Sequence, residues 1–237
     1  MKKLKILLGL SAVVNLAFIA IAGFVVYKQG GMVFVKEQWV SLTSEQEFPD
    51  YYVQKKAIFE SLDTSDPDKI FLGDSITDHG EFQEYFPEEV VLNRGIAEDT
   101  TKGVLNRIDE VVERNPEEVY IMIGINDIGA GADAAAYEKN MRKIIESFDL
   151  AKTRLVLQSI LPVNTEDFNN ELSNKTVDEF NQVLQKLAEE YSIGYINLHP
   201  KFENAEGQLE EQLTIDGIHL KGEGYDRWAA EIERRSI

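Results

Sequence analysis

The sequence predicts an α/β domain built on a parallel sheet. Short runs rich in β-branched and other apolar residues alternate along the chain with longer segments whose apolar residues recur at helical spacing. Five strands are expected, over residues 69–72, 90–93, 119–123, 154–159 and 195–198. Because a helix-length segment separates each pair, consecutive strands are expected to run in the same direction.

Apolar stripes predict the helices between these strands. Val104, Ile108 and Val111 fall on one helical face, which indicates a helix that packs on the sheet. Two later segments carry similar stripes, formed by Tyr137, Met141, Ile144 and Phe148 and by Phe180, Val183, Leu184 and Leu187. One more helix is expected over 51–62, before a polar turn leads into the first strand.

The first 28 residues predict a membrane anchor. Lys2, Lys3 and Lys5 precede a nearly continuous apolar run over 6–27. As a helix this run would reach about 33 Å, enough to cross a hydrocarbon core of about 30 Å. The leading lysines place the N-terminus in the cytoplasm and the remaining chain outside. A cleaved signal peptide, processed at Ala20-Ile21-Ala22, is the alternative; the apolar run continues past that point, which favours a single-pass signal anchor.

Composition limits what the rest of the chain can be. Residues 29–50 are interpreted as a juxtamembrane connector and residues 51–237 as one folded domain, since 43% of the chain is hydrophobic and 28% charged. The absence of cysteine excludes disulfides, thiolate metal sites and a cysteine nucleophile. A net charge of −18 argues against nucleic acid as a partner and is typical of a solvated acidic surface.

Four short motifs supply the parts of a serine esterase. They are Gly73-Asp74-Ser75, Asn93-Arg94-Gly95, Gly124-Ile125-Asn126-Asp127 and Asp216-Gly217-Ile218-His219. Ser75 can serve as nucleophile, His219 as the base that takes its proton, and Asp216 as the group that orients the base. Gly95 and Asn126 can donate hydrogen bonds to an oxyanion. We therefore expect these five residues to form one catalytic site.

The positions of the motifs support a common site. Ser75, Gly95 and Asn126 each follow a different expected strand, so all three should reach the carboxyl edge, where open α/β sheets bind ligands. Alone, Ser75 could be a helix N-cap, Gly95 a tight bend and Asn126 a turn residue. Their joint placement favours catalysis.

Three histidines compete for the role of base. His219 is favoured because Asp216 precedes it by three residues, which lets both side chains approach the serine from one loop. His79 lies too close in sequence to Ser75 to be the obvious base, and His199 is expected at the end of the fifth strand.

Taken in order, the motifs resemble those of the SGNH, or GDSL-type, hydrolases from about residue 69 to residue 228. The stretches Asn93-Arg94-Gly95-Ile96 and Asp99-Thr100-Thr101 are most similar to the branch of platelet-activating-factor acetylhydrolase-like esterases. The resemblance implies a three-layer α/β/α flavodoxin-like sandwich and an acyl-serine on Ser75, without metal or cofactor. It also implies an oxyanion hole formed by the backbone N–H groups of Ser75 and Gly95 and the amide of Asn126. Ala97-Glu98 departs from the pattern, because relatives often have glycines there.

The expected function is hydrolysis of short acyl esters, acetyl esters above all, on carbohydrates or other molecules at the cell surface. Acyl transfer to a surface polymer and a catalytically silent glycan-binding module are the alternatives. The intact nucleophile and base argue against the silent module, since binding alone needs no activated serine. A polar loop over 163–175 follows the fourth strand and is expected to influence substrate choice. A monomer and a dimer fit the sequence equally well.

Overall fold

The computed structural model describes residues 24, 28, 31, 48–168 and 170–234. The chain divides into two units, Met1–Glu47 and Phe48–Ile237. Of the predicted membrane helix over 6–27 only residue 24 is described, and of the predicted connector over 29–50 only residues 31 and 48–50; the rest of both segments lies outside the described residues. Among the helices that are described, none combines the length and the apolar character needed to cross a bilayer.

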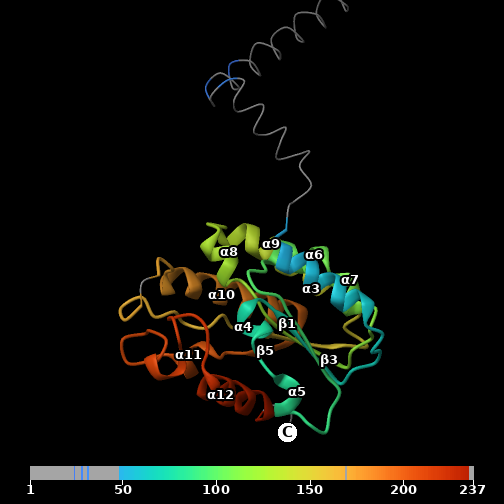
Figure 1. The fold of residues 1–237 in the computed structure, drawn as a ribbon. Helices are drawn as coiled ribbons and strands as arrows, with labels where there is room; N and C mark the ends of the chain where they lie inside the picture. Colours follow the sequence, from blue (N-terminus) through green and yellow to red (C-terminus); the bar gives the residue numbers. More distant parts are fainter. Residues whose placement is uncertain (1–23, 25–27, 29–30, 32–47, 169, 235–237) are drawn as a thin grey trace, which may run out of the picture. The chain divides into compact units, whose positions relative to one another are not determined.

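Five parallel strands form the sheet of the second unit (Figure 1). They are β1 (Lys69–Gly73), β2 (Val91–Gly95), β3 (Glu118–Met122), β4 (Arg154–Gln158) and β5 (Gly194–Ile196). Their order across the sheet is β2-β1-β3-β4-β5, the arrangement of flavodoxin-like folds. The predicted α/β class and the five parallel strands are thus confirmed, with strand boundaries within two residues of those expected.

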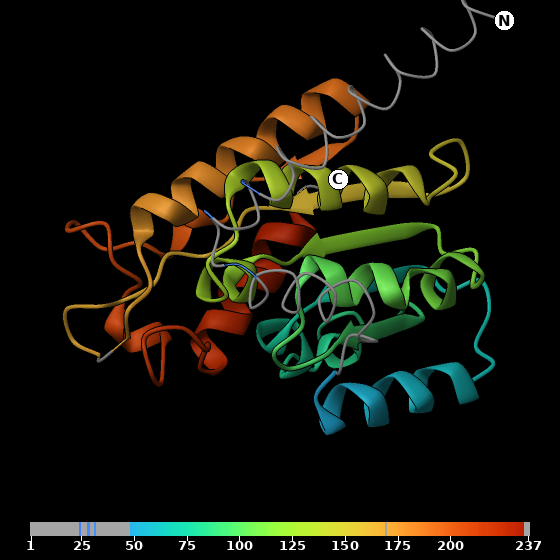
Figure 2. The ribbon, with the colours of Figure 1, turned by 90° about the horizontal axis from the view of Figure 1, so that it is seen from above.

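Helices cover both faces of the sheet (Figures 1 and 2). One face packs against α6 (Thr101–Asn106), α7 (Ile108–Val112), α9 (Ala134–Glu146) and α10 (Asn174–Tyr191). The other packs against α5 (Phe82–Tyr85), α11 (His199–Phe202) and α12 (Gly222–Glu233). The second unit also contains the short elements α4 (Ser75–Asp78), α8 (Ile125–Gly129) and η1 (Glu211–Leu213). The domain therefore has two hydrophobic cores, one on each side of the sheet.

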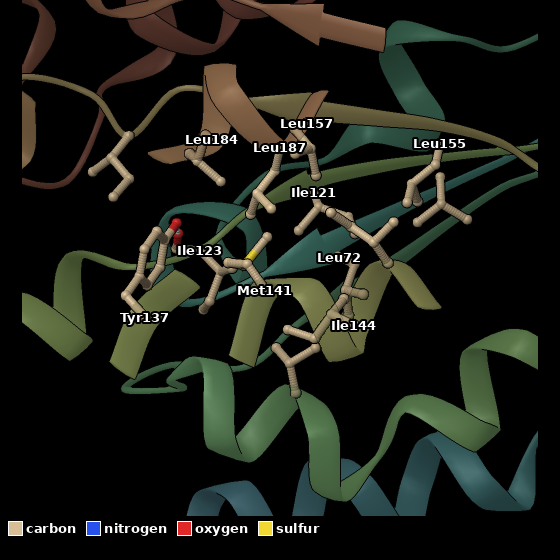
Figure 3. Close-up of a cluster of buried hydrophobic side chains, with 14 of the residues drawn as sticks. Leu72, Ile121, Ile123, Tyr137, Met141, Ile144, Leu155, Leu157, Leu184 and Leu187 are labelled. Carbon is tan, nitrogen blue, oxygen red and sulfur yellow. Dashed lines mark hydrogen bonds between the residues drawn. The ribbon is translucent and has the colours of Figure 1, made fainter. Parts of the chain in front are cut away.

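Two of the predicted helical stripes fill the first core (Figure 3). Tyr137, Met141 and Ile144 of α9 are fully buried there, beside Leu184 and Leu187 of α10. They pack against alternate residues of β1, β3 and β4, because every second side chain of a strand points to the same face. Burial of this apolar surface is the main force that holds α9 and α10 on the sheet.

The predicted helix through Val104, Ile108 and Val111 is divided into α6 and α7. All three side chains are buried as expected, but the helix breaks at Arg107, whose backbone has φ −127° and ψ 11°. The Arg107 guanidinium turns inward and donates to the carboxylate of Asp99. It also donates to the backbone carbonyl oxygens of Gly73 and Arg94 at the ends of two strands. The break between α6 and α7 thus coincides with the hydrogen bonds that the buried Arg107 guanidinium donates.

Helix α3 (Asp50–Ser61) precedes the first strand, close to the predicted range of 51–62. Its buried residues Tyr52 and Phe59 pack with Ile96, and the guanidinium of Arg94 lies 4.5 Å from the centre of the Phe59 ring. Arg114 of the segment after α7 donates to the carbonyl oxygen of Phe59. These contacts fix α3 to the main body of the domain.

Candidate active site

Ser75 lies at the start of α4, directly after β1. The side chain of Asp74 accepts a hydrogen bond from the backbone N–H of Ile76 at 3.0 Å and so caps the helix. Ser75 is 8% exposed, and its hydroxyl points toward the loop that precedes α12, to which it is hydrogen-bonded. The strand-to-helix turn thus presents the hydroxyl at the carboxyl edge of the sheet.

The three residues predicted as a triad lie in one hydrogen-bonded chain. The Oγ of Ser75 is 2.9 Å from Nε2 of His219, and Nδ1 of His219 is 2.6 Å from Oδ2 of Asp216. This is the arrangement in which a histidine can remove the serine proton while a carboxylate holds its ring. The structure therefore brings together residues that lie near the two ends of the domain's sequence.

The loop that carries Asp216 and His219 is held by its own hydrogen bonds. Oδ1 of Asp216 accepts from the backbone N–H groups of Ile218 and His219 at 3.0 and 2.8 Å. Thr214 donates its hydroxyl to the carbonyl oxygen of His219 and accepts from the N–H of Gly217. Gly217 has φ +86°, a conformation that favours glycine. The three-residue spacing thus forms a tight turn that presents both side chains together.

The same hydrogen bonds control the protonation of Asp216. Burial raises the pKa of this carboxyl, but hydrogen bonds from the backbone and ring of His219 and from the backbone of Ile218 outweigh it and hold the pKa below its ordinary value. Asp216 is therefore ionised near neutral pH and can stabilise a protonated His219 ring.

The loop predicted to influence substrate choice packs against this turn. The backbone N–H of Asn164 donates to the carbonyl oxygen of Gly217 at 2.9 Å, and the side chain of Asn170 donates to the carbonyl oxygen of Asn164. A Cβ at Gly217 would lie 2.4 Å from that Asn164 oxygen. This part of the predicted 163–175 loop therefore supports the backbone that carries the base.

Asn126 lies in the first turn of α8, after β3, and its side chain reaches toward the turn that follows β2. Its Nδ2 donates to the carbonyl oxygen of Asp99 at 2.8 Å. An amide nitrogen carries two hydrogens, so one remains for a substrate oxygen. The neighbouring Asp127 faces the interior, where it accepts from the backbone and hydroxyl of Thr101. Asn126 is thus placed to donate, and Asp127 is structural.

Gly95 occupies a different environment from the one predicted. Its N–H donates to Oδ1 of Asn93 at 2.7 Å, so this donor already has an acceptor within the chain. A Cβ at this position would lie 2.1 Å from the backbone nitrogen of Asp78. Glycine is therefore required here for the close approach of β2 and α4, and the structure does not present its N–H as an open oxyanion donor.

Glu98 is a residue that the motifs did not single out as a donor. Its backbone has φ +64°, in the left-handed region that non-glycine residues seldom occupy. Within the described part of the chain its N–H has no acceptor, and the next residue, Asp99, supplies the oxygen that binds Asn126. The departure from glycine at Ala97-Glu98 was the only sequence signal that this turn is unusual.

Buried carboxyl groups lie behind the site. Burial raises the pKa of Asp74 to about 7, with a smaller contribution from the charges of Asp99 and Asp127. Burial also raises the pKa of Asp99 to about 6, although its ion pair with Arg107 at 2.8 Å opposes the shift. Burial likewise raises the pKa of Asp127, against hydrogen bonds from Thr101. Burial is thus the common cause of the three raised pKa values, and Arg107 is the charged partner of Asp99 among these carboxyl groups.

The exposed rim of the site carries an imidazole and an apolar side chain. The His79 ring lies 5.4 Å from the His219 ring, centre to centre, and Ile215, next to Asp216, is 68% exposed. His199, the third histidine, is buried elsewhere at the start of α11, where its Nδ1 lies 3.1 Å from the carbonyl oxygen of Ile160. No three His, Asp or Glu side chains of the described residues gather closely enough to bind a metal.

Comparison with known proteins agrees with the fold described above. The model of the GDSL-like lipase/acylhydrolase family matches residues 71–227. Among solved structures, one named for platelet activating factor, from Streptococcus pneumonia, superposes with a TM-score of 0.72 at 26% identity, covering 87% of this chain and 98% of that one.

Curated relatives include two esterases that act on acetyl esters. The acetylxylan esterase of Geobacillus stearothermophilus is 25% identical over 66% of this chain and 87% of its own. The isoamyl acetate-hydrolyzing esterase of Saccharomyces cerevisiae is 26% identical over 63% of this chain and 69% of its own. An N-acylneuraminate cytidylyltransferase of Streptococcus agalactiae is 24% identical over 76% of this chain, which spans only 43% of that protein.

Proposed function

Because this chain belongs to the GDSL-like lipase/acylhydrolase family and is a carboxylic-ester hydrolase, we propose that it removes short acyl groups, chiefly acetyl, through an acyl-serine on Ser75. The observation that carries the proposal is the continuous hydrogen-bonded chain from Ser75 through His219 to Asp216. A serine hydroxyl is a poor nucleophile until a base takes its proton, and this chain provides the base and its orienting carboxylate.

The proposed reaction follows from these positions. As Oγ of Ser75 attacks the acyl carbon, Nε2 of His219 takes its proton, and the ionised Asp216 stabilises the charged ring. His219 then gives this proton to the alcohol oxygen as the ester bond breaks. A water molecule, activated by the same nitrogen, attacks the acyl-serine, releases the carboxylic acid and restores Ser75.

We infer that the oxyanion is bound by Asn126 and by backbone N–H groups of Ser75 and Glu98. The free N–H of Glu98 supports this assignment, as does the bond between Asn126 and the adjacent Asp99. The N–H of Gly95, in contrast, is bonded to Asn93. Loss of the Asn126 amide should lower turnover about 10²- to 10³-fold. A much smaller loss would remove Asn126 from the oxyanion hole.

The acetyl preference is supported by the two acetyl-ester hydrolases among the relatives. The acetylxylan esterase further supports an O-acylated carbohydrate as substrate. The exposed carboxylate of Glu98 beside the proposed oxyanion hole would repel anionic groups near the acyl carbon, so neutral esters should react faster than anionic ones. Glu98→Gln should bring the hydrolysis rates of neutral and anionic esters closer together. If the ratio of the two rates is unchanged in this variant, Glu98 is not the origin of the preference.

The proposed place of action is the outer surface of the cell membrane, with residues 1–28 as a single-pass anchor. The support is the basic and apolar pattern of that segment. Recovery of the full chain in the membrane fraction, with its catalytic domain open to protease added outside intact cells, is the expected result. A chain that is released, and begins near Gly23, would instead show signal-peptide cleavage.

The function is tested by hydrolysis of acetyl, butyryl and octanoyl p-nitrophenyl esters by the full chain in detergent, with Ser75→Ala as the matched variant. We expect turnover to decline with acyl length and to vanish in Ser75→Ala. Equal turnover by both proteins would refute the acyl-serine. Binding of acetylated glycans without turnover would favour the silent binding module, and faster reaction with octanoyl esters would refute the acetyl preference.

A further inference from the structure

We propose that α3 holds the nucleophile helix α4 in its reactive position, through two side chains that bind Asp78. Asp78 is the last residue of α4, three residues after Ser75. Its side chain is only 4% exposed, and both carboxylate oxygens have a partner on α3. The hydroxyl of Tyr51 donates to Oδ2 at 2.6 Å, and Nζ of Lys55 lies 2.6 Å from Oδ1. The proposal rests on the catalytic role given to Ser75 above.

The nucleophile helix needs such external support because it has only four residues. A helix of one turn is not stable by itself, so its position depends on contacts with other elements. On one side, Nδ2 of Asn93 donates to the carbonyl oxygens of Thr77 and Gly80, each at 2.7 Å. On another, the hydroxyl of Tyr225 donates to the carbonyl oxygen of Ile76. The two donors on α3 complete this support at the C-terminal end.

Asp78 is also adjacent to a residue that contacts the proposed base. His79 follows it directly, and the His79 ring lies 5.4 Å from the ring of His219. A shift at the end of α4 would therefore alter the position of Ser75 and the ring contact with His219 together. We assign Asp78, Tyr51 and Lys55 as positioning residues, because they act through α4 and not on the substrate.

The bond from Tyr51 has the character of a charge-assisted contact. Tyr51 is 43% exposed, while its hydroxyl is bound to a nearly buried carboxylate. This hydrogen bond, with burial and the charge of Asp78, raises the pKa of Tyr51 to about 12. The hydroxyl therefore remains protonated and able to donate at neutral and mildly alkaline pH.

Helix α3 also contains a matched control for each partner. Tyr52 and Lys56, the next residues along the chain, bind α6 instead of α4. The hydroxyl of Tyr52 donates to the carbonyl oxygen of Gly103 at 2.7 Å, and Nζ of Lys56 donates to Oδ1 of Asn106 at 3.3 Å. Each pair thus contains one tyrosine and one lysine, but only the first reaches the nucleophile helix.

The test compares two double variants of the full chain, Tyr51→Phe/Lys55→Met and Tyr52→Phe/Lys56→Met. In each we would measure kcat and KM for acetyl p-nitrophenyl ester, the rate of labelling of Ser75 by a fluorophosphonate, and the melting temperature. Tyr51→Phe/Lys55→Met should lower kcat and the labelling rate by about tenfold or more, because small misplacements of reacting atoms reduce rates strongly. Its KM should change less than about twofold, since no substrate contact is lost.

Tyr52→Phe/Lys56→Met should also lower the melting temperature, because Tyr52 is buried, and leave kcat within about twofold. Equal losses of kcat in the two double variants would overturn the proposal, as would native kcat in Tyr51→Phe/Lys55→Met. Lys55→Arg, which keeps the charge, should retain most of the turnover. Ser75→Ala is measured in parallel: if it remains active, the proposed function fails, whereas its inactivity beside a fully active Tyr51→Phe/Lys55→Met refutes only the positioning role.

Discussion

A methyl group added at Gly95 would test how closely β2 and the nucleophile helix must approach. The Cβ of Gly95→Ala would lie 2.1 Å from the backbone nitrogen of Asp78, 2.5 Å from its Cα and 2.6 Å from the carbonyl carbon of Thr77. All three are backbone atoms, so no side-chain rotation can relieve the contact. Either β2 or α4 must move.

The size of the effect follows from these distances. Ordinary van der Waals contact begins near 3.4 Å, so α4 would have to withdraw by about 1 Å. Overpacking of this kind costs roughly 1–3 kcal/mol of unfolding free energy. The same withdrawal would carry Ser75 away from His219, and a misplacement of about 1 Å can lower turnover about 10²-fold. We expect both losses in Gly95→Ala.

Denaturant unfolding measures the loss of unfolding free energy, and hydrolysis of acetyl p-nitrophenyl ester measures the loss of turnover. Gly222→Ala is the control, because a Cβ there meets nothing within 4 Å; this variant should be as stable and as active as the parent protein. Native stability in Gly95→Ala would refute the close packing of β2 on α4. A loss of stability with native turnover would show that Ser75 does not move with this helix.

Three further predictions concern the carboxylates around the site. Burial raises the pKa of Asp74 from 3.8 to about 7, so the folded protein binds this proton more tightly than the unfolded chain, and unfolding free energy should fall as pH rises from about 4 to about 7. In Asp74→Asn, the fall in unfolding free energy between pH 4 and pH 7, measured by urea unfolding at several pH values, should be smaller by roughly 4 kcal/mol. The same pH dependence in both proteins would contradict the raised pKa of Asp74. Asp216→Asn should lower kcat about 10³- to 10⁴-fold without unfolding the domain, a result that a loss below tenfold would exclude. Arg107→Met should destabilise the domain by about 3–5 kcal/mol in denaturant titrations, because it leaves the fully buried Asp99 without its charged partner; adding Asp99→Leu should recover part of this loss, and no recovery would argue against the ion pair as its cause.

Local patterns in the sequence were sufficient to predict the sheet and the proximity of Ser75, Asp216 and His219. The strands are short apolar runs between turns, and the apolar stripes of α9 and α10 have helical spacing, so neither depends on knowing a distant partner. The meeting of Ser75 with Asp216 and His219 followed from the rule that parallel strands bring their carboxyl ends to one edge.

Other features depend on backbone conformation and on distant partners, which residue types do not specify. Gly95 is a glycine because α4 approaches it closely, while its N–H is taken by Asn93. Glu98 adopts a left-handed conformation that its side chain does not favour. Arg107 lies on an apolar helical pattern, yet its bonds to strand carbonyls coincide with a break in the helix. The predicted oxyanion donors differ most from the structure, because the N–H of Gly95 is bonded to Asn93.

The bond between Ser75 and His219 joins residues 144 positions apart, which has a consequence for the protein during its synthesis. At about 5–20 residues per second, a ribosome needs roughly 7–30 seconds to reach His219 after it has made Ser75. Throughout that interval the nascent chain contains Ser75 but lacks His219, the proposed base. On the proposed mechanism, ester cleavage therefore begins only after residue 219 has been made, and a message truncated shortly before that residue yields a protein without activity.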